Sequence, residues 1–118
     1  MDYKEFTYPK KEKLKSRTLI KRVFEEGKVI KAYPILIKYV EIDKDKHLVS
    51  VNVSKRIFKK AVDRIRLKRQ LREAYRLNKS SLIQKPSKYA IMIGFIGKKK
   101  MDYKHIQTKV NQLLEEIN

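Results

Sequence analysis

Ten of the 22 residues between positions 55 and 76 are lysine or arginine, and this run is the feature most able to do chemistry. Only Asp63 and Glu73 carry the opposite charge there. Cations at positions 64, 68, 72 and 76 recur every fourth residue, so on a helix they share one side at intervals of about 6 Å. Phosphates recur along a nucleic-acid strand at a comparable spacing, and arginine offers forked donors that match phosphate oxygens. The run therefore predicts a phosphate-binding helix.

A solvent-exposed helix with no binding role is the alternative interpretation. Such helices usually mix charges of both signs, because like charges four residues apart cost about 0.2–0.5 kcal/mol each. The scarcity of acidic residues in this run favours nucleic-acid binding. The whole chain agrees, because 31 Lys and Arg against 13 Asp and Glu give 118 residues a net charge of +18. A charge of that size on so small a body calls for a polyanionic partner.

Residues that could carry out catalysis are few. The chain has no cysteine, which excludes disulfides, thiolate metal sites and a cysteine nucleophile. Its two histidines, His47 and His105, have no Cys, His or paired carboxylate at metal-ligand spacing. We interpret both as surface or packing residues. Motifs for phosphate loops, dinucleotide binding, serine hydrolases and zinc proteases are absent. We predict no catalytic residue, and no metal or cofactor bound by the protein alone.

The elements that must position the cations fit one domain, residues 1–118. Residues 1–13 are polar and basic, and we expect a mobile arm there. The polar beginning also predicts no signal peptide. The longest mostly apolar run, residues 89–97, is far shorter than the ~20 residues of a membrane helix. We therefore expect a cytoplasmic protein with no membrane partner.

Three helices are predicted. Ser16 is a good N-cap and Gly27 a good C-terminal residue for the first, whose apolar residues form one stripe. Residues 61–78 lack Gly and Pro and form the cationic helix. Asp102 can cap the last helix, in which apolar residues recur at helical spacing up to Ile117.

Strands are predicted between these helices. Residues 28–42 are rich in β-branched and aromatic types, and Pro34 forces a break or an edge position, so this stretch holds one strand or two. A turn at residues 43–46 precedes a period-two strand at residues 49–53. Residues 89–96 are apolar on both faces, which predicts a central, covered strand. The order predicts an α+β fold with helices packed on a four-stranded sheet.

Aromatic side chains give a smaller signal. Phe24, Tyr33 and Tyr39 could stack on unpaired bases, or could belong to the core. Phe58 lies among cations just before the cationic helix, where it is either exposed or a hydrophobic anchor for the loop.

The segment VSKRIFKKAVDRIRLKRQLREAYRLNK, residues 53–79, resembles the signature of the bacterial ribonuclease P protein component. That family carries Ser-Lys, a short basic loop, Ala-Val, and then an Arg-Asn-Arg helix that continues x-Lys-Arg-x-x-Arg-Glu. The positions that match in order and spacing are Ser54, Lys55, Ala61, Val62, Arg64, Arg66, Lys68, Arg69, Arg72 and Glu73.

The resemblance extends upstream and also has departures. KLKSRTLIKRVFEEGK, residues 13–28, is similar to the family's first helix, including Phe24 and Gly27. Ile65 replaces the middle Asn of the motif, and Ile20 stands where many relatives carry a second aromatic residue. The loop at residues 56–60 lacks the glycine often found there.

This resemblance implies a two-layer αβββαβα sandwich with a left-handed βαβ crossover. It implies the protein subunit of ribonuclease P, which binds the catalytic RNA subunit and the 5′ leader of precursor tRNA and assists endonucleolytic removal of the leader. The RNA subunit and its Mg²⁺ would do the chemistry, with one protein per RNA. The residues it implies for the RNA subunit are the cations Lys55, Arg56, Lys59, Lys60, Arg64, Arg66, Lys68, Arg69 and Arg72. The residues it suggests for the leader are Lys13, Lys15, Arg17, Phe24, Tyr39 and Asn52.

Other functions stay open at this point. A ribosomal or other structural RNA-binding protein would have the same size and charge. A protein-only nuclease would need a metal-binding cluster, which the sequence does not offer. A DNA-binding architectural protein is a third alternative.

Overall fold

The computed structural model describes residues 13–117. In chain order its elements are α1 (Arg17–Glu26), β1 (Lys28–Ala32), β2 (Ile35–Ile42), β3 (Leu48–Val53), α2 (Ala61–Asn78), α3 (Ser80–Ile83), β4 (Lys88–Phe95) and α4 (Tyr103–Glu116). Residues 28–42 form two strands that are separated at Tyr33 and Pro34, as the position of the proline indicates. The sequence did not predict the short helix α3.

The strands form one sheet in the order β1-β2-β4-β3. β2 is antiparallel to β1 and to β4, whereas β3 and β4 are parallel. β4 therefore lies inside the sheet, and its residues from Tyr89 to Phe95 are all buried. The prediction of a central strand that is covered on both faces is confirmed.

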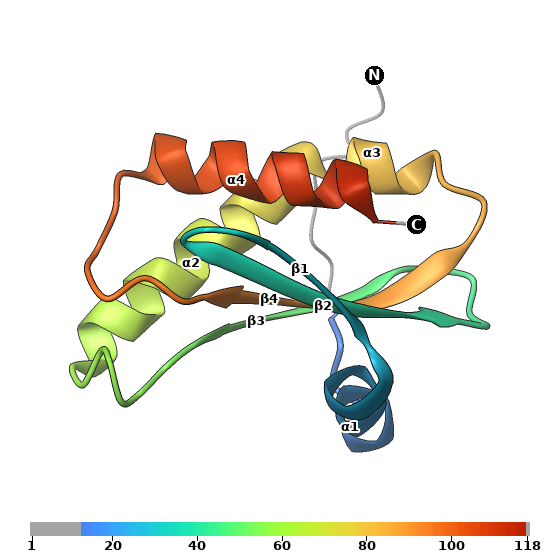
Figure 1. Cartoon of the computed structure of the whole chain (residues 1–118), viewed down its shortest axis with the longest axis horizontal. Coiled ribbons are helices and arrows are strands. Elements are labelled where there is room, and N and C mark those ends of the chain that lie inside the picture. The colour runs from blue at the N-terminus through green and yellow to red at the C-terminus, as the bar shows by residue number, and fades with distance from the viewer. Residues whose placement is uncertain (1–12, 118) are drawn as a thin grey trace.

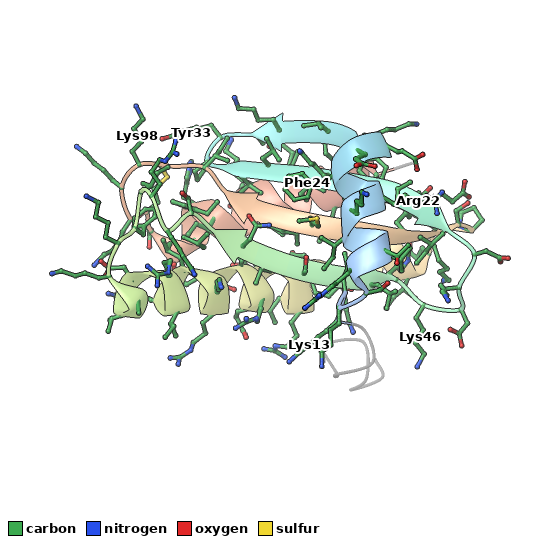
Figure 2. The ribbon with its side chains drawn as sticks, turned by 90° about the horizontal axis from the view of Figure 1, so that it is seen from below. Lys13, Arg22, Phe24, Tyr33, Lys46 and Lys98 are labelled. Carbon is green, nitrogen blue, oxygen red and sulfur yellow. The ribbon has the colours of Figure 1, made fainter. Side chains whose placement is uncertain are left out.

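The connection from β3 through α2 to β4 crosses over the sheet, because β3 and β4 are parallel neighbours. Viewed with α1 in front (Figure 2), both strands run leftward and β4 lies on the β2 side of β3. α2 lies on the opposite face of the sheet from α1 (Figure 1). This arrangement is a left-handed βαβ crossover, as the family resemblance implies. It is an exception to the rule that such crossovers are right-handed.

Helices cover both faces of the sheet (Figure 1). α2 and α4 pack over the main core, which includes Ile37, Leu71 and Leu113. α1 crosses the other face over a smaller cluster that contains Val23 and Met92. The α+β fold with helices on a four-stranded sheet is thus confirmed. α1 adds a partial third layer to the two layers that the resemblance implies.

The ends of α1 are fixed by two small residues. The Ser16 hydroxyl accepts a hydrogen bond from the Leu19 amide at 3.3 Å, as an N-cap does. At the other end the Gly27 amide donates to the Val23 carbonyl at 3.0 Å. Gly27 has an ordinary extended backbone, so glycine is not needed for its conformation. A Cβ atom there would instead collide with the Val23 carbonyl oxygen.

The predicted arm lies almost wholly outside the described residues. Of residues 1–13 the structure describes only Lys13, which forms an isolated parallel bridge with Val49. The next residue, Leu14, is buried, and its amide donates to the Val49 carbonyl at 2.8 Å. The chain just before α1 is therefore held at the β3 edge of the sheet.

His47 is buried and joins three elements. Its Nδ1 accepts a hydrogen bond from the Tyr89 amide at 3.1 Å, so Nε2 carries the proton and donates to the Leu82 carbonyl at 2.9 Å. The ring also stacks on the Tyr89 ring, with 6.0 Å between centroids. His47 is thus a packing residue, whereas His105 is exposed on α4.

His47→Ala should lower the free energy of unfolding by about 2–4 kcal/mol, because the buried Tyr89 amide and Leu82 carbonyl each lose a partner. Urea unfolding followed by circular dichroism measures this difference. His105→Ala is the matched control, and its free energy of unfolding should stay within about 0.5 kcal/mol of the parent value. Equal stability of the two variants would contradict the bridging role of His47.

Candidate nucleic-acid interface

A basic loop, residues 54–60, connects β3 to α2 and is built around two anchors. The Ser54 hydroxyl accepts hydrogen bonds from the amides of Arg56 and Ile57 at 3.1 and 3.4 Å. Phe58 is buried, and its ring packs edge-on against Phe95 with 5.7 Å between centroids. Phe58 is therefore the hydrophobic anchor of the loop rather than an exposed stacking residue. The four cations of the loop are exposed: Lys55, Arg56, Lys59 and Lys60.

Arg64 closes this loop from the first turns of α2. Its Nη1 donates to the carbonyls of Phe58 and Lys59 at 2.8 and 2.9 Å. These carbonyls lie just before a helix whose N-cap, Lys60, makes no side-chain capping bond. Arg64 thus holds the basic loop in shape, and its predicted contact with RNA stays a prediction.

Arg64→Ala should increase the hydrogen-exchange rate of the Phe58 amide about tenfold, because the loop loses two charge-assisted hydrogen bonds. Exchange followed by NMR measures this rate at a single amide. Arg69→Ala is the matched control, since Arg69 is exposed on the same helix and no hydrogen bond joins it to the loop within residues 13–117. If both variants exchange at the same rate, Arg64 does not secure the loop.

The exposure of side chains along α2 corrects the predicted phosphate-binding face. Leu67, Leu71, Ala74 and Tyr75 are buried against the core. The exposed cations of α2 form a basic ridge, which consists of Arg66, Arg69 and Arg72. Lys68 is half-buried beside the core face. The exposed cations of α2 therefore recur every third residue. The predicted face at positions 64, 68, 72 and 76, based on four-residue spacing, is wrong.

The two acidic residues of this region are paired away from the basic ridge. The Lys100 ammonium hydrogen-bonds Asp63 at 2.8 Å and so lowers the pKa of that carboxyl. The Arg76 guanidinium hydrogen-bonds Glu73, with 3.2 Å between Nε and Oε2, and lowers the pKa of Glu73. Both carboxylates are thus ionised at neutral pH. Arg66 also attracts Asp63 electrostatically, but within residues 13–117 no salt bridge joins either carboxylate to Arg66, Arg69 or Arg72. The ridge is therefore not neutralised by these two carboxylates.

A second surface is the open sheet face, the part of the sheet that α1 leaves uncovered (Figure 2). Phe24 of α1 is 61% exposed beside it. The Lys38 ammonium of β2 lies 4.4 Å from the centroid of the Phe24 ring, within cation–π distance. Asn52 of β3 is exposed on the same face, next to Gly94. One aromatic ring, one cation and one amide thus share this face.

Tyr39 does not belong to the open sheet face, which corrects its prediction as a leader-binding residue. Ile35, Ile37 and Tyr39 alternate with Lys38 along β2 and face the main core. Tyr39 is only 4% exposed, and its ring packs edge-on against Tyr89 with 5.6 Å between centroids. It is therefore unavailable for stacking on a base.

The other predicted leader residues are cations at the start of α1. Lys15 and Arg17 are exposed there, and Lys13 is exposed at the β3 edge (Figure 2). Sequence reasoning missed Lys38, although its alternation with the apolar residues of β2 places it opposite the core and could have identified it. Tyr33, a possible stacking residue by sequence, is 51% exposed at the same end of the sheet as Lys98 (Figure 2).

A small pocket of about 150 Å³ lies between α2 and the segment that follows β4, and is lined by Arg66, Leu67, Gln70, Lys100 and Met101. Among residues 13–117 no three His, Asp or Glu side chains gather in a way that could hold a metal ion. No helix in the same range has both the length and the apolar character needed to cross a membrane.

Known proteins share both this sequence pattern and this fold. A family model described as ribonuclease P matches residues 8–118. The ribonuclease P protein component of Porphyromonas gingivalis is 33% identical over 119 residues, which cover 95% of this chain and 87% of that protein. The ribonuclease P protein component of Petrotoga mobilis is 31% identical, and the match covers 94% of this chain and 95% of that protein. The solved structure of the RNase P protein from Thermotoga maritima superposes with a TM-score of 0.77 at 25% identity, covering 91% and 98% of the two chains.

Proposed function

This chain belongs to the family of bacterial ribonuclease P protein components, and from that premise we propose that it binds the catalytic RNA subunit and the 5′ leader of precursor tRNA. Membership in the family gives it a part in a tRNA-processing ribonuclease. Our proposal adds that it assists endonucleolytic removal of the leader in the cytoplasm, with one protein per RNA subunit and the chemistry done by RNA.

The observation that carries the proposal is the basic ridge beside the basic loop. Arg66, Arg69 and Arg72 are exposed, and no salt bridge within residues 13–117 neutralises them. The loop next to them is held in shape by Ser54 and Arg64. Neutralising RNA phosphates with such cations releases counterions and supplies much of the affinity. Because the loop is already shaped in the free protein, little ordering opposes binding.

The open sheet face fits a single-stranded leader. Lys38, with Lys15 and Arg17 at the start of α1, can hold the phosphates of an extended strand. Phe24 offers an exposed ring on which a base can stack, and stacking depends little on the identity of the base. Because only the precursor has a leader, these contacts would raise its affinity above that of mature tRNA.

Magnesium enters this proposal through the RNA. The two surfaces consist of ammonium, guanidinium, aromatic and amide groups, and none of them supplies the carboxylates that Mg²⁺ prefers. The protein therefore binds and positions RNA. Its positive charge would also reduce repulsion between the RNA subunit and the precursor, and so lower the Mg²⁺ concentration that the complex needs.

Reconstitution tests the proposal. The protein is added to an in vitro transcribed bacterial ribonuclease P RNA and precursor tRNA, at a Mg²⁺ concentration too low for the RNA alone to cleave. We expect cleavage at the 5′ end of the mature tRNA only when both protein and RNA are present. Failure to stimulate cleavage would favour a structural RNA-binding role, and cleavage by the protein without RNA would favour a protein nuclease.

A further inference from the structure

Three large apolar side chains are exposed around the start of α2. Val62 is 75% exposed, Ile65 is 55% exposed, and Ile57 of the basic loop is 40% exposed. We refer to Ile57, Val62 and Ile65 as the apolar patch. The basic loop and α2 otherwise bury their large apolar residues, as Phe58, Leu67 and Leu71 show.

The helical geometry makes the two helix residues of the apolar patch, Val62 and Ile65, continuous with the basic ridge. Val62, Ile65 and Arg69 are three and four residues apart, so they follow one side of α2. The first turns of this side are apolar and the following turns are cationic. β-branched residues are poorer helix formers than lysine or arginine, so the free protein gains nothing in helix propensity from Val62 and Ile65.

The surroundings of the apolar patch indicate what covers it. Arg56 and Lys55 border Ile57 in the loop, and Arg66 and Arg69 follow Ile65 on the helix. A second copy of a chain with a net charge of +18 would be repelled by such a border. A folded RNA fits, because its phosphates match the cations. The riboses that line its shallow minor groove and the unstacked base faces in its loops offer apolar area.

We propose that the apolar patch docks against ribose and base surfaces of the RNA subunit and supplies a part of the affinity that salt does not weaken. This inference rests on the proposed function, in which the neighbouring ridge binds the same RNA. Phosphate contacts weaken steeply with salt because they release counterions, whereas apolar burial does not depend on counterions. The two parts of the interface can therefore be separated by experiment.

The test compares variants of the full chain by their affinity for an in vitro transcribed bacterial ribonuclease P RNA, titrated over a series of monovalent salt concentrations. The double variant Val62→Thr/Ile65→Gln keeps the approximate size of both side chains but makes them polar, and it avoids the Asn that the family motif carries at position 65. We expect its affinity to fall about tenfold at every salt concentration, with an unchanged slope of log affinity against log salt. Ile65→Leu, which stays apolar, should bind like the parent. Arg69→Gln should bind more weakly and with a slope reduced by nearly one.

Each outcome has a distinct meaning. If the double variant binds like the parent while Arg69→Gln loses affinity, the ridge stands and the apolar contact is refuted. If neither change affects binding, the proposed RNA-binding role of this helix fails as well. Sedimentation of the RNA-free protein tests whether a second copy of the chain covers the apolar patch instead. A dimer that forms in the parent protein and is lost in the double variant would overturn docking on RNA. Thermal melting should be unchanged in every variant, since the altered side chains are exposed.

Discussion

Replacing Arg66, Arg69 and Arg72 together with glutamine should weaken binding of the ribonuclease P RNA about 100-fold in about 0.15 M monovalent salt. Each phosphate contact contributes a factor of about 5 at that salt concentration, and three contacts multiply. The slope of log affinity against log salt should fall in magnitude by about 2–3. Filter binding or fluorescence anisotropy over a salt series measures both quantities. The effect is large because the three side chains are exposed and keep their charge.

A control with the same loss of charge removes three cations elsewhere. Lys44 lies in the turn before β3, and Lys104 and Lys109 lie on α4, so Lys44→Gln/Lys104→Gln/Lys109→Gln lowers the net charge equally without touching the ridge. We expect this variant to bind within a few-fold of the parent. If both triple variants lose the same affinity, general charge attracts the RNA and the ridge has no special role.

Phe24→Ala should lower the affinity of the reconstituted complex for precursor tRNA by about 10-fold or more, with little change for mature tRNA. Stacking of one base on an aromatic side chain contributes about 1–3 kcal/mol, which corresponds to about 5–150-fold in affinity. The Phe24 ring is 61% exposed, so its removal should not unfold the protein. Equilibrium binding of the two tRNA forms to the complex of protein and RNA subunit measures the difference.

Two further variants make this test specific. Ile83→Ala removes a similarly exposed apolar side chain, 47% exposed, from α3 and should leave both affinities unchanged. Phe24→Trp keeps a ring on which a base can stack and should retain the preference for the precursor. If Phe24→Ala lowers the affinity for precursor and mature tRNA equally, Phe24 does not contact the leader.

Much of the fold follows from local patterns in the sequence. The N-cap at Ser16 is confirmed because it depends on one local hydrogen bond. The period-two strand at residues 49–53 and the doubly apolar strand around Ile91 are confirmed because each pattern reflects burial of the strand itself. α3 is only four residues long, too short for a helical period to be detected. The crossover handedness depends on how β3, α2 and β4 stack in space, and no local pattern contains that information.

The candidate site was less predictable because side chains in it serve the fold as well as the surface. Arg64 has the spacing of a phosphate-binding residue, but the carbonyls of Phe58 and Lys59 need a donor and Arg64 provides it. Tyr39 has an aromatic ring that could stack on a base, yet strand alternation places it in the main core. The same alternation places Lys38 on the open sheet face. Resolving such cases requires knowledge of which face of each element is buried.

The position of α1 and α2 on opposite faces of the sheet has an electrostatic consequence. The ridge and Phe24 are separated by a sheet and the helix layers on either side of it, spaced about 10 Å apart, which gives about 20 Å in total. The Debye length at physiological ionic strength is about 8 Å. Two polyanions held on these surfaces would thus contact the protein more than two Debye lengths apart. Salt in the solution around the protein would therefore screen most of the repulsion between these two contact sites.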